Sequence, residues 1–230
     1  MTGSAVLVHG AWSSPEEWCF VDEGLWAAGV EVLAVDLPSH RSATAKRAQD
    51  VAVVEEAIAA ASPPIVVVGW SYGGALLTEC DLDEERVARL VYVASLPDAP
   101  PSDPDDRPTA PPLDPANFDF PNDETIVLRD DWWKDTGRSP FSAAAIHHLR
   151  DHPRRPVSIA ALVGPAMGHA WGVISTTLLL GRDDNLIPPE LQEWASRNFP
   201  DVRIIDCDHF VPLRAPDHVV AIVLEALVPH

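Results

Sequence analysis

Five residues, Gly69-Trp70-Ser71-Tyr72-Gly73, join the apolar run 65–68 directly to the helix-like segment that begins at Ala75. A short β-branched run is typical of a buried strand. A strand that turns sharply into a helix holds its central serine in a strained conformation, so residues two positions away must lack bulk. The pattern predicts a nucleophile elbow with Ser71 raised above the sheet, although a plain glycine-rich turn is the alternative.

Short apolar runs alternate with helical patterns along most of the chain. We expect strands at 5–8, 30–35, 65–68, 89–94, 176–180 and 202–205, and helices at 15–28, 43–61, after Ser71, at 190–199 and at 216–227. For the first helix, Ser14 is the expected N-cap and Glu17 the expected capping-box glutamate. Strands and helices at this spacing predict an α/β fold with a mostly parallel, doubly wound sheet covered on both faces.

The middle of the chain breaks this alternation. Segment 97–121 is dense in proline and aspartate and predicts no regular element, whereas 142–150 is helical in pattern. We interpret 97–171 as a lid inserted over the carboxyl ends of the strands, and 1–96 with 172–230 as the core. A poorly ordered surface excursion is the alternative for the proline-rich half.

Charge and cysteine content limit the partners that we expect. With 35 acidic against 16 basic side chains, the formal charge is −19, which disfavours nucleic acid and anionic membranes as partners. Cys19, Cys80 and Cys207 lie far apart without metal-ligand spacing, as in a reduced cytoplasmic protein. No signal peptide or membrane span is apparent. We expect no metal or cofactor, a small-molecule substrate, and either a monomer or a homodimer.

A serine nucleophile needs a base and an orienting carboxylate, because an unassisted hydroxyl is weakly nucleophilic. Such partners lie after later strands, where ligands meet in an open α/β sheet. Asp183 and Asp184 follow one strand and His209 follows the next, which gives the order Ser, Asp, His. The residues alone do not choose between the two aspartates. The competing histidines are His9, His147, His148, His152 and His169.

Two further groups complete the predicted site. Gly10 after the first strand lets the backbone pass close, so the N–H groups of Ala11 and Tyr72 are the expected oxyanion donors. The expected pocket is aromatic, with core or lid packing as the alternative for each member: Trp12, Trp132, Trp133, Phe141 and Trp171.

Segments 6–12, 69–74, 90–94 and 184–189 resemble the α/β-hydrolases, and within them the branch of plant methyl-ester esterases such as the salicylate methylesterases, hydroxynitrile lyases and bacterial esterase relatives. The resemblance covers nearly the whole chain and is weakest across 100–150. It implies Ser71 as nucleophile, His209 as base, Asp184 as acid, and Ala11 and Tyr72 as oxyanion donors.

Departures from related patterns narrow the expected activity. The first loop lacks the threonine, and the segment after His209 lacks the lysine, that hydroxynitrile lyases of this type add. Ser71 stands where haloalkane dehalogenases and related epoxide hydrolases place an aspartate. We therefore expect a serine hydrolase that cleaves an ester of a small apolar or aromatic substrate. Lactone or C–C bond hydrolysis, and a receptor-like binding protein that retains the triad, remain as alternatives.

Overall fold

A central sheet organises the chain in the computed structural model, which describes residues 3–97, 107–129, 141–164, 168 and 170–228. The sheet has six strands in the order β2-β1-β3-β4-β8-β9, and every neighbouring pair is parallel. The strands are β1 (Ser4–Val8), β2 (Glu31–Val35), β3 (Ile65–Trp70), β4 (Val87–Val93), β8 (Thr176–Gly181) and β9 (Val202–Ile205). This topology confirms the predicted parallel, doubly wound sheet.

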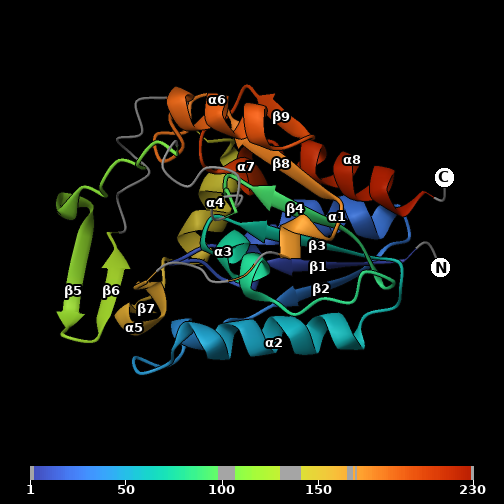
Figure 1. Cartoon of the computed structure of the whole chain (residues 1–230). Helices are drawn as coiled ribbons and strands as arrows, with labels where there is room; N and C mark the ends of the chain where they lie inside the picture. Colours follow the sequence, from blue (N-terminus) through green and yellow to red (C-terminus); the bar gives the residue numbers. More distant parts are fainter. Residues whose placement is uncertain (1–2, 98–106, 130–140, 165–167, 169, 229–230) are drawn as a thin grey trace.

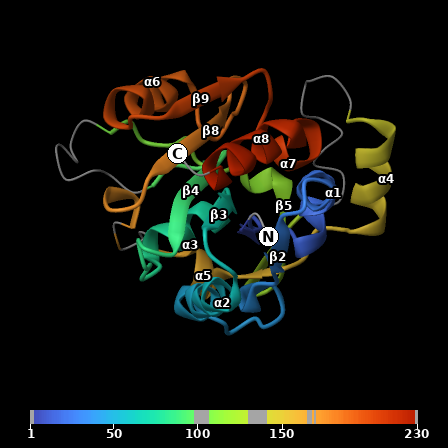
Figure 2. The ribbon, with the colours of Figure 1, turned by 90° about the vertical axis from the view of Figure 1, so that its right-hand side faces the viewer.

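Helices cover both faces of the sheet, because alternate side chains of each buried strand point to opposite sides. Helices α2 (Arg47–Ala60), α3 (Tyr72–Glu79) and α6 (Pro189–Asn198) share one apolar layer with Val67 and Leu178. Helices α1 (Cys19–Ala27) and α8 (Pro216–Leu227) share the other with Val68 and Leu179. Figure 2 shows α2 and α3 on one side of the strands and α1 and α8 on the other. The short α7 (Val211–Arg214) precedes α8.

The start of the first helical segment differs from the prediction. A 3-10 turn, η1 (Pro15–Trp18), precedes α1, and the Ser14 side chain makes no capping hydrogen bond. Glu17 is buried, and its two carboxylate oxygens accept hydrogen bonds from Arg154 at 2.8 and 3.1 Å. The predicted capping box is therefore wrong, because a long-range ion pair takes the carboxylate that the local pattern assigned to the helix start.

Segment 97–171 contributes no described strand to the central sheet and builds a small second sheet instead. Its strands are β5 (Phe118–Asn122), β6 (Thr125–Leu128) and β7 (Val157–Ser158), in that order. The expectation of no regular element before residue 122 is thus wrong at its end. Pro121 is tolerated because β5 is an edge strand and its pairing with β6 is irregular between Asp119 and Asn122.

The remaining described elements of this insertion connect the small sheet to the core. They are η4 (Pro115–Asn117), α4 (Ala143–Asp151), α5 (Ile159–Leu162) and η6 (Ala170–Gly172). The guanidinium of Arg47 on α2 donates hydrogen bonds to the carbonyls of Ala161, Leu162, Val163 and Gly164. The end of α5 is therefore fastened to the core, whereas the β5–β6 hairpin projects beyond the carboxyl ends of the central strands (Figure 1).

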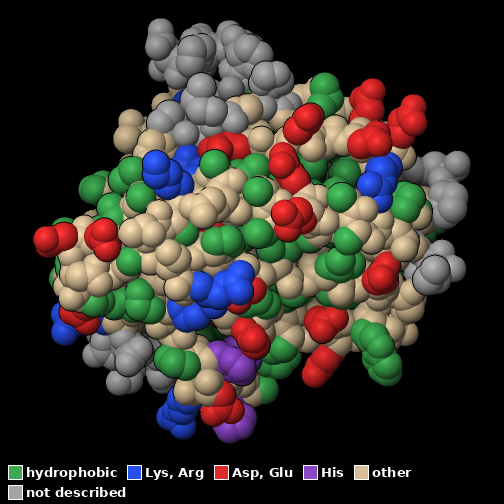
Figure 3. All heavy atoms as spheres, turned by 90° about the horizontal axis from the view of Figure 1, so that it is seen from below, with side chains coloured by type: hydrophobic (Ala, Val, Ile, Leu, Met, Phe, Trp, Pro, Cys, Tyr) green, Lys and Arg blue, Asp and Glu red, His purple; other side chains and the backbone are tan. Residues whose placement is uncertain are grey.

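One face of the molecule shows how its acidic side chains are distributed. On the face seen from below, acidic side chains are spread between apolar and basic ones rather than gathered in one patch (Figure 3). In the described part of the chain, no helix combines the length and apolar character that crossing a membrane requires.

Candidate active site

Ser71 occupies a strained turn between β3 and α3. Its φ is 53° and its ψ is −116°, in the region that L-residues other than glycine rarely adopt. Neighbouring strands fix this conformation, because Ser71 N–H donates to the Val93 carbonyl at 3.0 Å and its own carbonyl accepts from Ser95 Oγ at 2.9 Å. The turn therefore has the backbone geometry of an elbow that presents a side chain above the sheet.

The two glycines around Ser71 are required by close backbone contacts. A Cβ atom on Gly69 would lie 2.7 Å from backbone atoms of Gly73 and Gly74. A Cβ atom on Gly73 would overlap the carbonyl oxygens of Val8 and His9. Both side-chain positions are thus filled by main chain, which is the physical reason for the glycine spacing in the sequence.

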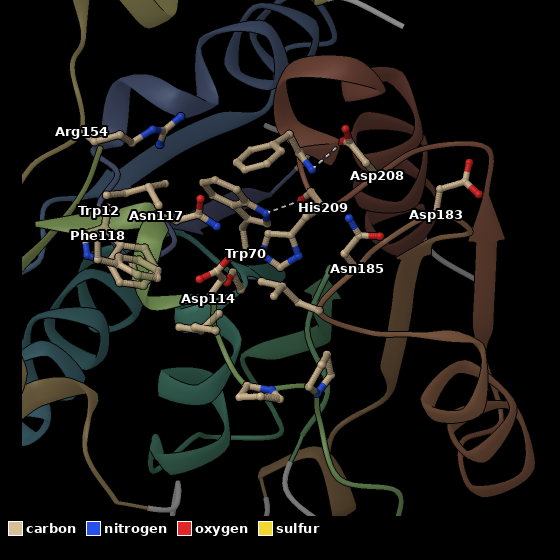
Figure 4. A pocket seen from close by; sticks show the side chains of 18 residues that line it. Trp12, Trp70, Asp114, Asn117, Phe118, Arg154, Asp183, Asn185, Asp208 and His209 are labelled. Carbon is tan, nitrogen blue, oxygen red and sulfur yellow. Dashed lines mark hydrogen bonds between the residues drawn. The ribbon is translucent and has the colours of Figure 1, made fainter. Parts of the chain in front are cut away.

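His209 is paired with Asp184 and not with Asp183. Asp184 is 3% exposed, and its Oδ2 lies 2.8 Å from Nδ1 of His209. Its Oδ1 accepts N–H groups from Leu186 at 2.8 Å and Ile187 at 3.2 Å. Asp183 lies at the cavity rim with its carboxylate turned away from the imidazole (Figure 4). The loop after β8 thus aims one aspartate at the histidine and the other away.

The loop after β9 holds His209 against the residue that precedes Ser71. The indole Nε1–H of Trp70 donates to the His209 carbonyl at 2.8 Å, and the two rings lie 5.9 Å apart (Figure 4). Ser71 and His209 line the same cavity. Residues from β3, β8 and β9 therefore converge at the carboxyl edge of the sheet, as the predicted chain order requires.

The cavity over Ser71 has a volume of about 380 Å³ and mostly apolar walls. Trp12 and Phe118 form one wall with ring centroids 4.9 Å apart, opposite the wall that carries Asn185 (Figure 4). The other lining side chains come from the central loops and the insertion: Ala11, Trp70, Pro111, Pro112, Leu113, Asp114, Asn117, Leu128, Arg154, Asp183, Leu186, Asp208, His209 and Phe210. The insertion thus supplies much of the cavity.

Only part of the aromatic set expected from the sequence lies at this cavity. Phe141 packs instead against Phe210 and lies 3.7 Å below the Arg214 guanidinium, and Trp171 packs against Phe199 at the core. Neither ring lines the cavity, because each packs among other apolar side chains: Phe141 in the cluster with Leu213, and Trp171 against the main core. Trp132 and Trp133 lie outside the described residues.

The sequence reasoning missed three aromatic side chains that do line the cavity: Trp70, Phe118 and Phe210. Two of them are direct neighbours of Ser71 and His209 in the chain, and that adjacency was a usable signal. Phe118 had no such signal, because it lies in the segment for which no regular element was expected. Its role follows from the β5–β6 hairpin, which places it against Trp12.

The backbone N–H groups of Ala11 and Tyr72, predicted as oxyanion donors, lie in the turn after β1 and at the start of α3. Ala11 lines the cavity, and its N–H donates to no acceptor in the described part of the chain. Tyr72 is the first residue of α3, so its N–H has no partner within the helix. The Tyr72 hydroxyl donates to buried Asp50 at 2.8 Å, and burial together with this carboxylate raises the pKa of the phenol.

The competing histidines lie elsewhere. His9 is fully buried beneath the Gly10 loop, where burial lowers its pKa to about 4. His147, His148 and His152 belong to α4 or its C-cap and do not line the cavity, and His169 lies outside the described residues. Among the described histidines, His209 thus shares the cavity with Ser71.

Arg154 and Asp208 at the cavity are engaged in ion pairs, and two thiols that do not line the cavity are protonated. Arg154 is paired with Glu17, and Asp208 Oδ2 lies 2.9 Å from Nε of Arg214. Burial raises the pKa of Cys19 to about 11 and that of Cys80 to about 12, so neither thiol is a nucleophile near neutral pH. Within the described ranges, no group of His, Cys, Asp and Glu is arranged to hold a metal ion.

Comparisons with known proteins agree with this architecture. No curated protein sequence matches the chain. Over 97% of this chain and 96% of the other, the chain is similar to a pyrethroid hydrolase from Sphingobium faniae JZ-2, with 18% identity and a TM-score of 0.68. The chain is also similar to methylesterase MES16 from Arabidopsis, with 18% identity and a TM-score of 0.71 over 97% of this chain and 98% of the other. Its similarity to tomato methylketone synthase I covers 96% of each chain, with 16% identity and a TM-score of 0.73.

These solved structures share the fold, and one of them is a plant methylesterase, as the sequence resemblance implied. The sequence model of the Alpha/beta hydrolase family matches residues 5–222, nearly the full length of the chain. The chain therefore belongs to the alpha/beta hydrolase family.

Proposed function

We propose that this protein is a serine hydrolase that cleaves a carboxylic ester of a small apolar or aromatic substrate. One observation carries the proposal: Ser71, on a strained elbow, lines the same cavity as a histidine whose Nδ1 is held by a buried carboxylate. Fixing Nδ1–H on Asp184 leaves Nε2 as the proton acceptor, which is what a general base requires.

In the first half of the reaction, His209 Nε2 takes the Ser71 proton as Oγ adds to the ester carbonyl carbon. The negative charge on the tetrahedral oxygen is stabilised by the N–H groups of Ala11 and Tyr72, with the start of α3 adding a favourable dipole. The C–O bond to the alcohol then breaks, and His209 returns the proton to the departing alkoxide. The product on the protein is an acyl group on Ser71.

In the second half, a water molecule attacks the acyl carbon, and His209 takes one of its protons. Collapse of the second tetrahedral adduct breaks the bond to Ser71 Oγ and gives the hydroxyl its proton again. Asp184 stabilises the imidazolium that forms in each half without accepting the proton itself. The imidazole of His209 therefore accounts for all four proton transfers.

The cavity supports a small and largely apolar substrate. About 380 Å³ is near the lower end of the range for small-molecule sites, and the aromatic rings of Trp12, Trp70, Phe118 and Phe210 line the cavity. Three similar solved structures are named as a pyrethroid hydrolase, a methylesterase and polyneuridine aldehyde esterase, names that agree with ester cleavage.

Labelling with a fluorophosphonate tests the nucleophile. We expect stoichiometric labelling of the wild type, no labelling of Ser71→Ala, and unchanged labelling of a control, Ser42→Ala, whose side chain is exposed and outside the cavity. The enzyme proposal is wrong if the folded wild type resists labelling and Ser71→Ala binds the substrate as the wild type does. That result would support the receptor-like alternative.

Substrate class is tested separately with p-nitrophenyl esters of increasing acyl length, matched lactones and a C–C bond substrate. We expect turnover of short and aromatic acyl esters that disappears in Ser71→Ala. If lactones or the C–C bond substrate are cleaved efficiently and esters are not, Ser71 remains the proposed nucleophile but the ester assignment is wrong.

A further inference from the structure

The turn that carries Ala11 contains a tryptophan with an unusual backbone conformation. Residues 10–13 form a turn in which the Ser13 N–H reaches the Gly10 carbonyl at 3.4 Å, a long hydrogen bond. Trp12 lies at the third position with a φ of 60°, where glycine or asparagine is the normal choice. A bulky side chain persists in this conformation only when surrounding contacts fix it.

The β5–β6 hairpin supplies one set of those contacts. The indole Nε1–H of Trp12 donates to the Ile126 carbonyl on β6 at 3.1 Å. The indole ring also packs against Phe118 on β5, with centroids 4.9 Å apart. A single side chain next to Ala11 is therefore bonded to the second strand of the hairpin and packed against the first.

Arg155, between α4 and β7, supplies the second set. Its backbone N–H donates to the Trp12 carbonyl at 3.0 Å, and its Nε donates to the Ser13 carbonyl at 2.8 Å. Its two remaining nitrogens reach His9 Nε2 at 3.2 Å and Asp36 at 2.9 Å. One residue of the insertion thus holds the last two carbonyls of the turn at 10–13 and also contacts His9, the residue that precedes the turn.

We propose that Trp12 and Arg155 are positioning residues through which the insertion sets the direction of the Ala11 N–H. This inference rests on the proposed ester hydrolysis and extends it: the insertion acts on the reaction itself and not only on access to the cavity. Among the described residues, the backbone hydrogen bond inside the turn is long, and His9 Nδ1 holds the Gly10 carbonyl at 2.8 Å, whereas the carbonyls of Trp12 and Ser13 are held by Arg155 of the insertion. Both anchors act through the backbone of the turn and need not touch the reacting atoms.

Two substitutions each remove the side-chain part of one anchor, and each has a matched control; the backbone hydrogen bond from Arg155 to the Trp12 carbonyl stays in both. Trp12→Phe keeps an aromatic ring beside Phe118 and deletes the indole donor, and its control is Trp26→Phe, at a tryptophan that is 79% exposed. Arg155→Met deletes the guanidinium, and its control is Arg41→Met, which removes another partner of Asp36 without touching the turn.

The readouts are kcat, KM and the inhibition constant of an aryl trifluoromethyl ketone. Ser71 Oγ adds to the carbonyl carbon of this ketone while the serine proton moves to His209. The resulting hemiketal oxyanion would lie between the N–H groups of Ala11 and Tyr72. We expect kcat to fall about 10- to 100-fold in each positioning variant, with KM nearly constant and the inhibition constant rising in parallel. Both controls should match the wild type. The double variant should lose less than the product of the single losses, because both changes release the same turn.

Two results separate the possible failures. If the wild type is labelled at Ser71 and turns over esters, but the variants change KM alone or leave the ketone affinity unchanged, the positioning role is wrong and Trp12 is only a cavity wall. If the wild type neither turns over esters nor reacts with the phosphonate, the proposed function fails and the positioning role fails with it. Thermal unfolding of all variants identifies any loss of kcat that follows loss of the folded protein.

Discussion

Asp184 holds His209 with one carboxylate oxygen while the N–H groups of Leu186 and Ile187 hold the other. The carboxylate is therefore fixed by its own loop before it orients the imidazole. Because the side chain is fully buried, little water competes for either oxygen. The loop after β8 thus determines which ring nitrogen of His209, after β9, faces the carboxylate.

Asp184→Asn should leave the loop in place and remove the charge that stabilises the imidazolium. We expect kcat to fall by about 10³- to 10⁴-fold with a small change in KM, measured with a p-nitrophenyl ester. The control is Asp206→Asn, at an exposed position outside the cavity. A larger loss of kcat in Asp183→Asn than in Asp184→Asn would contradict the assignment of the acid.

Gly73→Ala places a methyl group against the carbonyl oxygens of Val8 and His9, which belong to the backbone and cannot rotate away. We expect the free energy of unfolding to fall by about 3 kcal/mol, measured by urea denaturation. Gly172→Ala is the matched control, because its new methyl meets no described atom within 4 Å, and it should change stability by less than about 0.5 kcal/mol. Equal effects of the two substitutions would show that the elbow is not tightly packed.

The buried pair of Glu17 and Arg154 should contribute strongly when only one partner is removed. Glu17→Gln removes the carboxylate charge that pairs with the buried Arg154 guanidinium, whose side chain is 4% exposed. We expect a loss of about 3 kcal/mol in unfolding free energy. Asp151→Asn breaks the exposed pair with His147 and should cost less than about 1 kcal/mol. Similar losses for both variants in urea titrations argue against a special role for the buried pair.

Two buried histidines should make the fold sensitive to mild acid. Burial lowers the pKa of His9 from 6.5 to about 4, and it lowers that of His40 from 6.5 to about 2. Below pH 6.5 the unfolded chain binds protons at both imidazoles that the native protein excludes, so stability is complete above pH 6.5 and declines as the pH falls. By pH 4, His9 alone should account for about 3 kcal/mol.

Urea denaturation at several pH values between 6.5 and 4 measures this loss of unfolding free energy. His40→Phe keeps a ring in the buried position and removes one titrating group, so the unfolding free energy should fall less steeply, by up to about 1.4 kcal/mol per pH unit. His218→Asn, at an exposed position, should reproduce the wild-type slope. An unchanged slope in His40→Phe would mean that this imidazole is protonated in the native protein.

The central sheet could be predicted because its inner strands β1, β3 and β8 are buried along their whole length and are largely apolar in sequence. Val66 and Val67 face opposite layers, yet both must be apolar, and the same holds for Leu178 and Leu179. The loops after these strands meet at one edge, so chain order alone brought the serine, aspartate and histidine loops together. The choice between Asp183 and Asp184 depended on a turn geometry that composition does not encode.

The insertion was harder to predict because its order comes from contacts distant in sequence. Phe118 and Pro121 belong to an edge strand that pairs on one side only, so its sequence shows no uniform apolar run. Trp171 was expected in the pocket and Trp70 was not, yet Trp171 packs on Phe199 and Trp70 lies beside His209. Which aromatic ring reaches the cavity is decided by the path of the backbone between elements.

Strands β4 and β8 are neighbours in the sheet, although the whole insertion separates them in the chain. The segment before the insertion carries Ser71, Ala11 and Tyr72, and the segment after it carries Asp184 and His209. A chain divided within the insertion would thus yield one fragment with the proposed nucleophile and another with the proposed base. Catalysis would then require the two fragments to reassemble through the Leu90 to Val93 pairing with β8, and ester turnover would report their association.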